Sequence, residues 1–247
     1  MYEHPESAPV LVSPRHLAGA GLAQINEALT PLVKGFDWPH QRTASRIDVT
    51  SPCGSVQATF EPSRPDGRWW TVQDHQADWT AQFTGQTPVE AVTALLQALP
   101  NTLGDTRHAH RIETVTGTPS EIASAAGWSP ATEAEATTYT SPDSHCRVTH
   151  QPGSDVPWRV EHSVYDGFDT HWTGTFTRNT PDQLVSQFLA NLSSSAPVER
   201  LRHEIPYMAL HSGDALITPA AGTTPSPHLH HAVAEVVQAH TSHRPGR

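Results

Sequence analysis

The sequence predicts an α+β fold: two tandem α-ββββ-α repeats, each an antiparallel four-stranded meander sheet covered by helix, plus a small C-terminal appendage. The first observation behind this prediction is an internal repeat. Residues 79–88 return as residues 172–181, with six of ten positions identical at an offset of 93. The second is the alternation of apolar and polar residues in short segments, which is typical of strands buried on one face. The third is a Thr-Pro pair followed by an apolar stripe at helical spacing near the end of each repeat.

The duplication extends beyond its best-preserved stretch. Ser51-Pro52 matches Ser141-Pro142 at an offset of 90, and Trp70-Thr71-Val72 aligns with Trp158-Arg159-Val160 at an offset of 88. The register changes only in turn-like segments, as expected for a tandem duplication. We therefore predict repeat 1 over residues 8–100, repeat 2 over residues 104–194 and the appendage over residues 195–247; each repeat has the size of a domain.

Each repeat is expected to open with a helix. In repeat 1, Ser13 and Pro14 have the residue types of an N-cap and a first helical position, and an apolar pattern continues to Gly35. Pro31 falls inside this pattern and is expected to kink or split the helix. The shorter counterpart in repeat 2 runs from Pro119 to Gly127.

Four strands are predicted next in repeat 1, over residues 46–50, 55–60, 69–73 and 79–84. Repeat 2 shows the same alternation around residues 146–148, 158–160 and 172–176. Thr87-Pro88 and Thr180-Pro181 then begin the closing helices. A four-stranded sheet covered by a helix can be stable alone. The appendage is expected to hold a short hairpin, residues 205–210 and 215–218, and a helix beginning at Thr224-Pro225.

Composition limits the possible functions. The chain carries 15 Lys and Arg against 25 Asp and Glu, a formal net charge of −10, which opposes broad binding to nucleic acid or to anionic membranes. No apolar run approaches the roughly 20 residues of a membrane helix, and the N-terminus lacks a signal-peptide pattern. We therefore expect a cytoplasmic protein without a membrane partner. Cys53 and Cys146 occupy non-equivalent positions of the two repeats, so we expect free thiols, with Cys146 in the core.

Three segments carry a family resemblance. The run Val12-Ser13-Pro14-Arg15-His16-Leu17-Ala18-Gly19, then Ser51-Pro52-Cys53, and then Trp79…Phe83…Thr87-Pro88-Val89-Glu90 resemble an actinobacterial family, the domain-of-unknown-function family numbered 317. That family is often present in two copies per chain. The resemblance covers about residues 8–194 and is weaker in repeat 2, which lacks the Ser-Pro-Arg opening. It implies the domain boundaries and carries no activity.

The polar faces of the sheets hold the candidate binding residues. Trp69 is adjacent to Trp70, so in a strand one of the two indoles must lie on the far side of the sheet. Thr71 in repeat 1 and Arg147 and Arg159 in repeat 2 share that polar side by alternation. Such a face could bind single-stranded nucleic acid by stacking and phosphate contact. It could equally be a repeat–repeat or subunit interface, or a plain solvated face.

No catalytic or metal-binding pattern is visible in the sequence. There is no nucleophile elbow, no phosphate-binding Gly-rich loop and no dinucleotide fingerprint. The densest histidine groups, His108/His110 and His228/His230/His231, lack the partners and spacing of a zinc site. We therefore expect no catalytic residues, no metal and no cofactor.

Two functions remain open. The first hypothesis is a non-enzymatic protein-interaction or assembly module, binding an unknown protein partner or itself. The alternative is a single-stranded nucleic-acid binding protein that uses the polar and aromatic sheet faces of tandem ββββα units, although this rests on analogy of fold and the net charge opposes it.

Overall fold

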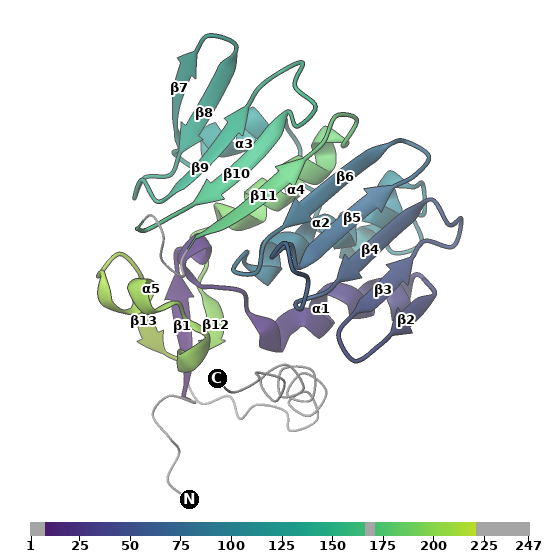
Figure 1. Ribbon diagram of the computed structural model, residues 1–247, viewed down its shortest axis with the longest axis horizontal. Helices are drawn as coiled ribbons and strands as arrows, with labels where there is room; N and C mark the ends of the chain where they lie inside the picture. The colour runs from purple at the N-terminus through teal and green to yellow at the C-terminus, as the bar shows by residue number, and fades with distance from the viewer. Residues whose placement is uncertain (1–7, 166–170, 221–247) are drawn as a thin grey trace, which may run out of the picture.

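A single antiparallel sheet of ten strands dominates the fold (Figure 1). The computed structural model describes residues 8–165 and 171–220. The strand order is β2-β3-β4-β5-β6-β11-β10-β9-β8-β7, so the two repeats lie side by side with their last strands paired. The strands are β2 (His40–Arg42), β3 (Ile47–Thr50), β4 (Val56–Phe60), β5 (Trp70–Asp74), β6 (Trp79–Phe83), β7 (Ser129–Glu133), β8 (Ala136–Thr140), β9 (Cys146–His150), β10 (Trp158–His162) and β11 (Trp172–Phe176).

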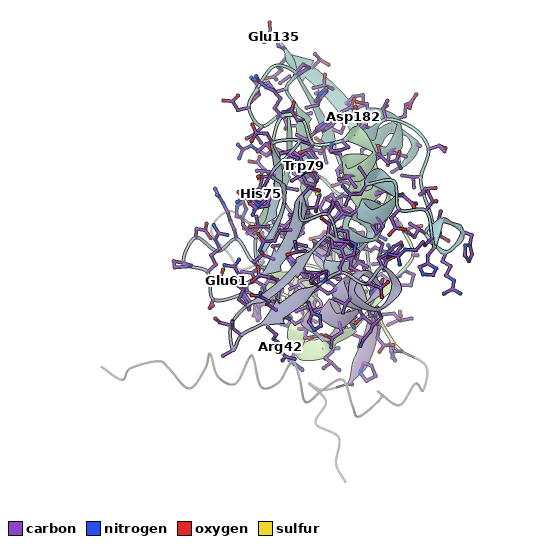
Figure 2. The ribbon with its side chains drawn as sticks, turned by 90° about the vertical axis from the view of Figure 1, so that its right-hand side faces the viewer. Arg42, Glu61, His75, Trp79, Glu135 and Asp182 are labelled. Carbon is purple, nitrogen blue, oxygen red and sulfur yellow. The ribbon has the colours of Figure 1, made fainter. Side chains whose placement is uncertain are left out.

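The helices lie on one side of this sheet, as the edge-on view in Figure 2 shows. The helices that pack against it are α1 (Ile25–Thr30), α2 (Val89–Thr102), α3 (Pro119–Ala125) and α4 (Asp182–Leu192). Helices α2 and α4, which close the two repeats, pack against each other. The Thr-Pro signals therefore predicted both closing helices. None of the helices in the described residues is long and apolar enough to cross a bilayer.

The predicted four-stranded sheets require two corrections. Each repeat contributes five strands, because β2 and β7 add an outer strand at either end. Every residue of both strands is exposed, and neither strand carries apolar alternation, so the sequence pattern could not reveal them. The two sheets are also joined into one, whereas the prediction treated each as a separate unit.

The seam between the repeats has a pseudo-twofold axis. Positions 81–83 of β6 correspond to positions 174–176 of β11, and Gln82 pairs with its own equivalent, Thr175. The amide of Thr84 donates to the carbonyl of Thr173 at 2.9 Å, and the equivalent amide of Thr177 donates to the carbonyl of Thr80 at 2.9 Å. Pairing of a surface with its own equivalent is the geometry of an isologous dimer. The chain is thus an internal dimer of two homologous units.

The repeated threonines are part of this seam. The hydroxyl oxygen of Thr84 accepts from the amide of Thr173 at 2.8 Å, and that of Thr177 accepts from the amide of Thr80 at 2.7 Å. The repeated rings lie behind them: Phe83 stacks on Phe188 of α4 at 4.9 Å and meets Phe176 edge-on at 5.5 Å. The Trp-Thr-x-x-Phe-Thr motif therefore serves both the core and the junction of the two repeats.

One hydrophobic core spans both repeats. The buried side chains of the two sheet halves and of α1, α2 and α4 form a single cluster. At the seam the core is tightly packed: a Cβ atom on Gly174 would lie 2.9 Å from Cδ1 of Phe83. Cys146 is fully buried in the cluster, as predicted, while Cys53 is exposed.

The opening helix of repeat 1 differs from its prediction. Ser13 ends a strand and only a short 3-10 turn follows it, Arg15–Leu17, so the Ser-Pro pair does not begin the helix. The helical segment starts later, with a 3-10 turn at Leu22–Gln24, and continues through α1. At Pro31 it changes to a π-helical turn, Pro31–Gly35, as expected for a proline inside a helix. In repeat 2, α3 begins with the capping box of Thr118 and Glu121.

A second, three-stranded sheet joins the two ends of the described chain. Strand β1 (Pro9–Ser13) lies between β12 (Val198–Leu201) and β13 (Leu216–Pro219), antiparallel to both. The predicted hairpin over residues 205–218 is wrong: this segment forms the short helix α5 (Tyr207–His211) and then β13. The helix predicted from Thr224 lies outside the described residues. We refer to residues 9–18 and 198–219, which hold β1, β12, α5 and β13, as the terminal clamp.

The terminal clamp is tied to both repeats. Arg200 of β12 is fully buried and donates to both carboxylate oxygens of Glu90 in repeat 1 at 2.6 Å. His16 contacts Asp143 of repeat 2 at 2.6 Å, and the indole of Trp172 donates to the carbonyl of His16 at 3.2 Å. The clamp thus connects the two repeats away from their seam.

Candidate functional site

The face of the ten-stranded sheet opposite the helices is continuous and polar. One transverse row crosses all ten strands, and its members pair in register. The row reads Gln41, Asp48, Thr59, Thr71, Gln82, Thr175, Arg159, Thr149, Thr138 and Ala131. We call the side of the sheet that bears this row the open face. It includes three of the four candidate binding residues predicted from the sequence: Thr71, Arg159 and, in the neighbouring row, Arg147.

The open face is large enough for a protein partner. Nine inter-strand spacings make the sheet roughly 43 Å wide, and five-residue strands make it roughly 16 Å deep, or roughly 700 Å² in projection. A standard protein–protein interface covers about 800 Å² on each partner. Its side chains are threonines, glutamines and a few charges, which are the residue types of a polar interface rim.

Trp69 is not on the open face. It precedes β5 and lies outside the strand, so the alternation rule does not apply to it. Its indole meets the ring of Phe60 edge-on at 6.4 Å and lies over Gly85, where a Cβ atom would be 2.6 Å from Cε2 of the indole. Trp69 is therefore a partly buried residue at the margin of the core.

Thr71 lies on the open face but is only 8% exposed. The guanidinium of Arg64, from the β4–β5 loop, donates to its hydroxyl at 3.3 Å. Beside it, Asp48 accepts from Arg46, Gln57 and Thr59. Burial raises the pKa of Asp48, but these hydrogen bonds and the charge of Arg46 outweigh it and leave the pKa below its ordinary value. The polar groups of the repeat-1 half of the face are thus bound to one another.

Arg147 and Arg159 are both exposed on the repeat-2 half. Arg159 lies 4.0 Å from Glu161, and each of these two side chains is 49% exposed. The structure therefore brings the two predicted arginines together on adjacent strands and separates them from Trp69. The nucleic-acid alternative needs Trp69 and the two arginines on one exposed surface, and Trp69 instead packs against the core of repeat 1.

The two edges of the sheet are poorly suited to adding another strand. β7 carries Pro130, which has no amide to donate, and β2 has only three residues and follows Pro39. Proline and very short edge strands are common protections against edge-to-edge pairing. The face is therefore the more accessible surface for a partner.

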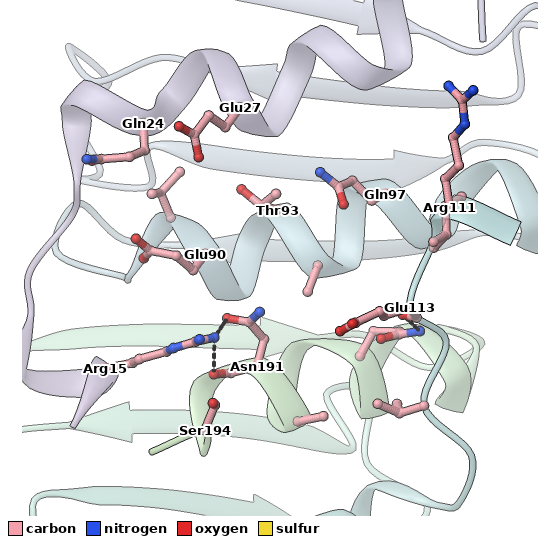
Figure 3. A pocket seen from close by; sticks show the side chains of 16 residues that line it. Arg15, Gln24, Glu27, Glu90, Thr93, Gln97, Arg111, Glu113, Asn191 and Ser194 are labelled. Atoms are coloured by element: carbon pink, nitrogen blue, oxygen red, sulfur yellow. Dashed lines mark hydrogen bonds between the residues drawn. The ribbon is translucent and has the colours of Figure 1, made fainter. Parts of the chain in front are cut away.

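A polar groove on the helix side is the second candidate site (Figure 3). It measures about 560 Å³ and lies between α1, α2 and α4, with Arg15 at one end and Arg111 at the other. Its side walls include Gln24, Glu27, Glu90, Thr93, Gln97, Glu113, Gln187 and Asn191. Figure 3 shows Arg15 reaching the C-terminal end of α4.

Arg15 and Glu90, at one end of the groove, are occupied by internal contacts. Arg15 donates to the side-chain and backbone oxygens of Asn191 at 2.7 and 3.1 Å, so it caps the carboxyl end of α4. Burial lowers the pKa of Arg15, the charge of Glu90 raises it and the charge of Arg200 lowers it further. The guanidinium of Arg200 donates to both carboxylate oxygens of Glu90. This end of the groove therefore joins the clamp to the helices.

A serine, an aspartate and a histidine lie in contact near the clamp, but they do not form a catalytic triad. Asp143 is the central residue: Ser141 donates to one of its oxygens and His16 contacts the other. The Ser141 oxygen also accepts from the amide of Cys146 at 2.9 Å. A nucleophilic serine needs the histidine, not the carboxylate, as its partner. No sequence signal linked these residues, because His16 lies in the N-terminal segment and Asp143 in repeat 2.

We find no metal centre within residues 8–165 and 171–220. No group of three or more His, Cys, Asp or Glu side chains in these residues could hold a metal ion. His108 meets the ring of Phe36 edge-on at 5.3 Å. The histidine group at residues 228–231 lies outside the described residues.

Cys53 takes the place in repeat 1 that Asp143 takes in repeat 2, and its sulfur lies 3.3 Å from Ser51 Oγ and 3.1 Å from Ser55 Oγ.

These features define a duplicated α+β protein with one ten-stranded antiparallel sheet and a large open face. Two segments, residues 50–103 and 140–198, match the family model of SPDY, a domain of unknown function (DUF317). Each segment covers the last three strands and the closing helix of one repeat, consistent with two copies of the family's domain. No curated protein and no solved structure matches the chain.

Proposed function

We propose that this protein is a non-enzymatic interaction module that binds a protein partner on the open face. The observation that carries the proposal is the continuous row across all ten strands, polar at every position except Ala131 of β7, on the side that no helix of the described residues covers in Figure 2. The side of the sheet that faces the helices is filled by the shared core, and the sheet edges are protected. The free thiols of Cys53 and Cys146 support action in the cytoplasm.

Protein is a better ligand for this face than single-stranded nucleic acid. Stacking on aromatic rings is the main source of affinity for single strands. The strand positions of the open face within the described residues carry no aromatic ring, because Trp69 packs on Phe60 instead. The exposed arginines of the repeat-2 half also share their surface with Glu161.

The proposal is tested by site-specific photocrosslinking in cells of the source organism. A photoreactive phenylalanine analogue replaces Gln82 or Thr175, at the centre of the open face, and in a control Ser124, which is exposed on α3. We expect discrete adducts from Gln82 and Thr175 and none from Ser124. An adduct of twice the chain mass identifies self-association, and any other discrete mass identifies a different partner. Absence of adducts, or equal adducts from all three positions, rejects the proposal.

A further inference from the structure

The two repeats serve as an internal reference for each other. Residues that fold the unit are shared between them, so positions where they differ on the exposed surface indicate specialisation of one copy. Three such positions lie together on the open face. Gln57, Thr71 and Gln73 of repeat 1 correspond to Arg147, Arg159 and Glu161 of repeat 2, and they occupy the same places in the strand register.

The polar groups at these positions are satisfied in repeat 1. Gln73 donates to Gln57 at 3.1 Å, and Gln57 donates to Asp48 at 3.1 Å. In repeat 2, the guanidinium of Arg147 makes no hydrogen bond or ion pair with any other residue of the described chain, and Arg159 has only the long contact with Glu161. An exposed guanidinium with unused donors is suited to carboxylate groups, which it can bind through two parallel hydrogen bonds.

A hollow adjoins Arg147. It measures about 540 Å³ and lies where β9 begins and β10 ends, with His145, His162 and His171 on its walls besides Arg147 and Glu161. Asp214 of the clamp lies 3.2 Å from His145. The hollow therefore places the Arg147 guanidinium beside a space large enough for a side chain.

We infer that the repeat-2 half of the open face binds an acidic peptide segment of a protein partner, with Arg147 and Arg159 receiving its carboxylates and the hollow receiving an adjacent side chain. The inference rests on the proposed function, since it specifies the partner of the same face. The formal charge of −10 repels any anion, but it repels a long chain of phosphates more strongly than a short acidic peptide, which carries fewer charges.

The test uses the full chain and a fluorescent decapeptide of alternating glutamate and serine, followed by anisotropy. The variant Arg147→Gln/Arg159→Thr places the repeat-1 residues in repeat 2, so it preserves side chains that this fold already accepts. We expect it to weaken binding by about tenfold or more. The control Lys34→Gln/Arg202→Gln removes the same charge from exposed sites elsewhere and should leave the affinity unchanged.

Matched peptides separate the outcomes. A glutamine–serine decapeptide should not bind, and raised salt should weaken the glutamate peptide. The inference is overturned if the glutamate peptide does not bind, if the glutamine peptide binds equally, or if both double variants behave alike. It is also overturned if an oligothymidylate of the same length binds more tightly than the glutamate peptide. Crosslinks at Gln82 and Thr175 without peptide binding would reject only the acidic partner and retain the proposed function.

Discussion

At the scale of single residues, the contacts around Asp143 join repeat 2 to the clamp. Burial raises the pKa of Asp143, but the hydrogen bond and charge of His16, with help from Ser141 and the amide of His145, outweigh it and hold the pKa well below its usual range. A carboxyl group with a depressed native pKa stabilises the fold above the pKa of the unfolded chain. Its contribution is lost as the pH falls from there through the native pKa.

We expect Asp143→Asn to lower the free energy of unfolding by about 1–3 kcal/mol at neutral pH. The difference from wild type should shrink below about pH 4, where the carboxyl group of the unfolded chain becomes protonated. Urea denaturation across this range measures both quantities. A difference that grows towards acid would contradict the assignment. The variant Asp155→Asn is the control, since that exposed carboxylate pairs with Arg178 at the surface.

The two cysteines should react very differently. Hydrogen bonds from Ser51 and then Ser55 lower the pKa of Cys53 to about 7, whereas burial raises the pKa of the Cys146 thiol. Because the thiolate is the nucleophile, we expect iodoacetamide to modify Cys53 with a half-maximal rate near pH 7 and to leave Cys146 unmodified in the folded protein. Mass spectrometry of timed samples checks this. The variant Ser55→Ala should move the rate profile to higher pH, and an unchanged profile would rule out the hydroxyl effect.

At the scale of elements, the seam between β6 and β11 depends on two equivalent hydroxyl groups. Thr84 and Thr177 each accept from a backbone amide of the opposite strand. We expect Thr84→Val and Thr177→Val each to cost about 1–2 kcal/mol, by similar amounts, because each leaves one amide without its acceptor. Thr175→Val is the control, since its side chain makes no hydrogen bond within the described residues, and it should change stability by less than about 0.5 kcal/mol. Unequal effects at Thr84 and Thr177 would contradict the pseudo-twofold seam.

At the scale of the whole molecule, the shared core predicts one unfolding transition. The hydrophobic cluster is continuous from one repeat to the other, so neither repeat can unfold without exposing the other's core. We expect the calorimetric and van't Hoff enthalpies of the full chain to agree. Two separate transitions would show that the repeats are independent.

The clamp should contribute to the stability of the entire chain. Removing one member of a buried ion pair typically costs about 3–5 kcal/mol, because its partner is left without compensation. We expect Arg200→Met to destabilise the protein by about 3 kcal/mol in a single transition, and Arg200→Met/Glu90→Leu to recover part of the loss. Loss of the clamp alone, with the sheet unfolding at its wild-type temperature, would contradict this coupling.

The sequence by itself determined the duplication, the last three strands of each repeat and the two closing helices. These features follow from local rules: alternation with a period of two, an apolar stripe at helical spacing and the Thr-Pro start of a helix. The same alternation placed Thr71, Arg147 and Arg159 on the polar side of the sheet. It failed for Trp69, because the rule holds only within a strand and β5 begins one residue later.

Only the tertiary structure decided how these units meet. Most hydrogen bonds that pair β6 with β11 are between backbone groups, which every sequence has. The side-chain pattern therefore does not predict that the two sheets join into one. The exposed strands β2 and β7 are stabilised by hydrogen bonds to the neighbouring strands β3 and β8, and not by burial of apolar side chains. The same is true of the clamp, where residues almost 200 positions apart, such as Arg200 and Ala18, meet by long-range contacts that local propensity cannot encode. The open face is likewise a product of this assembly, since it becomes wide enough for a protein partner only when both repeats share one sheet.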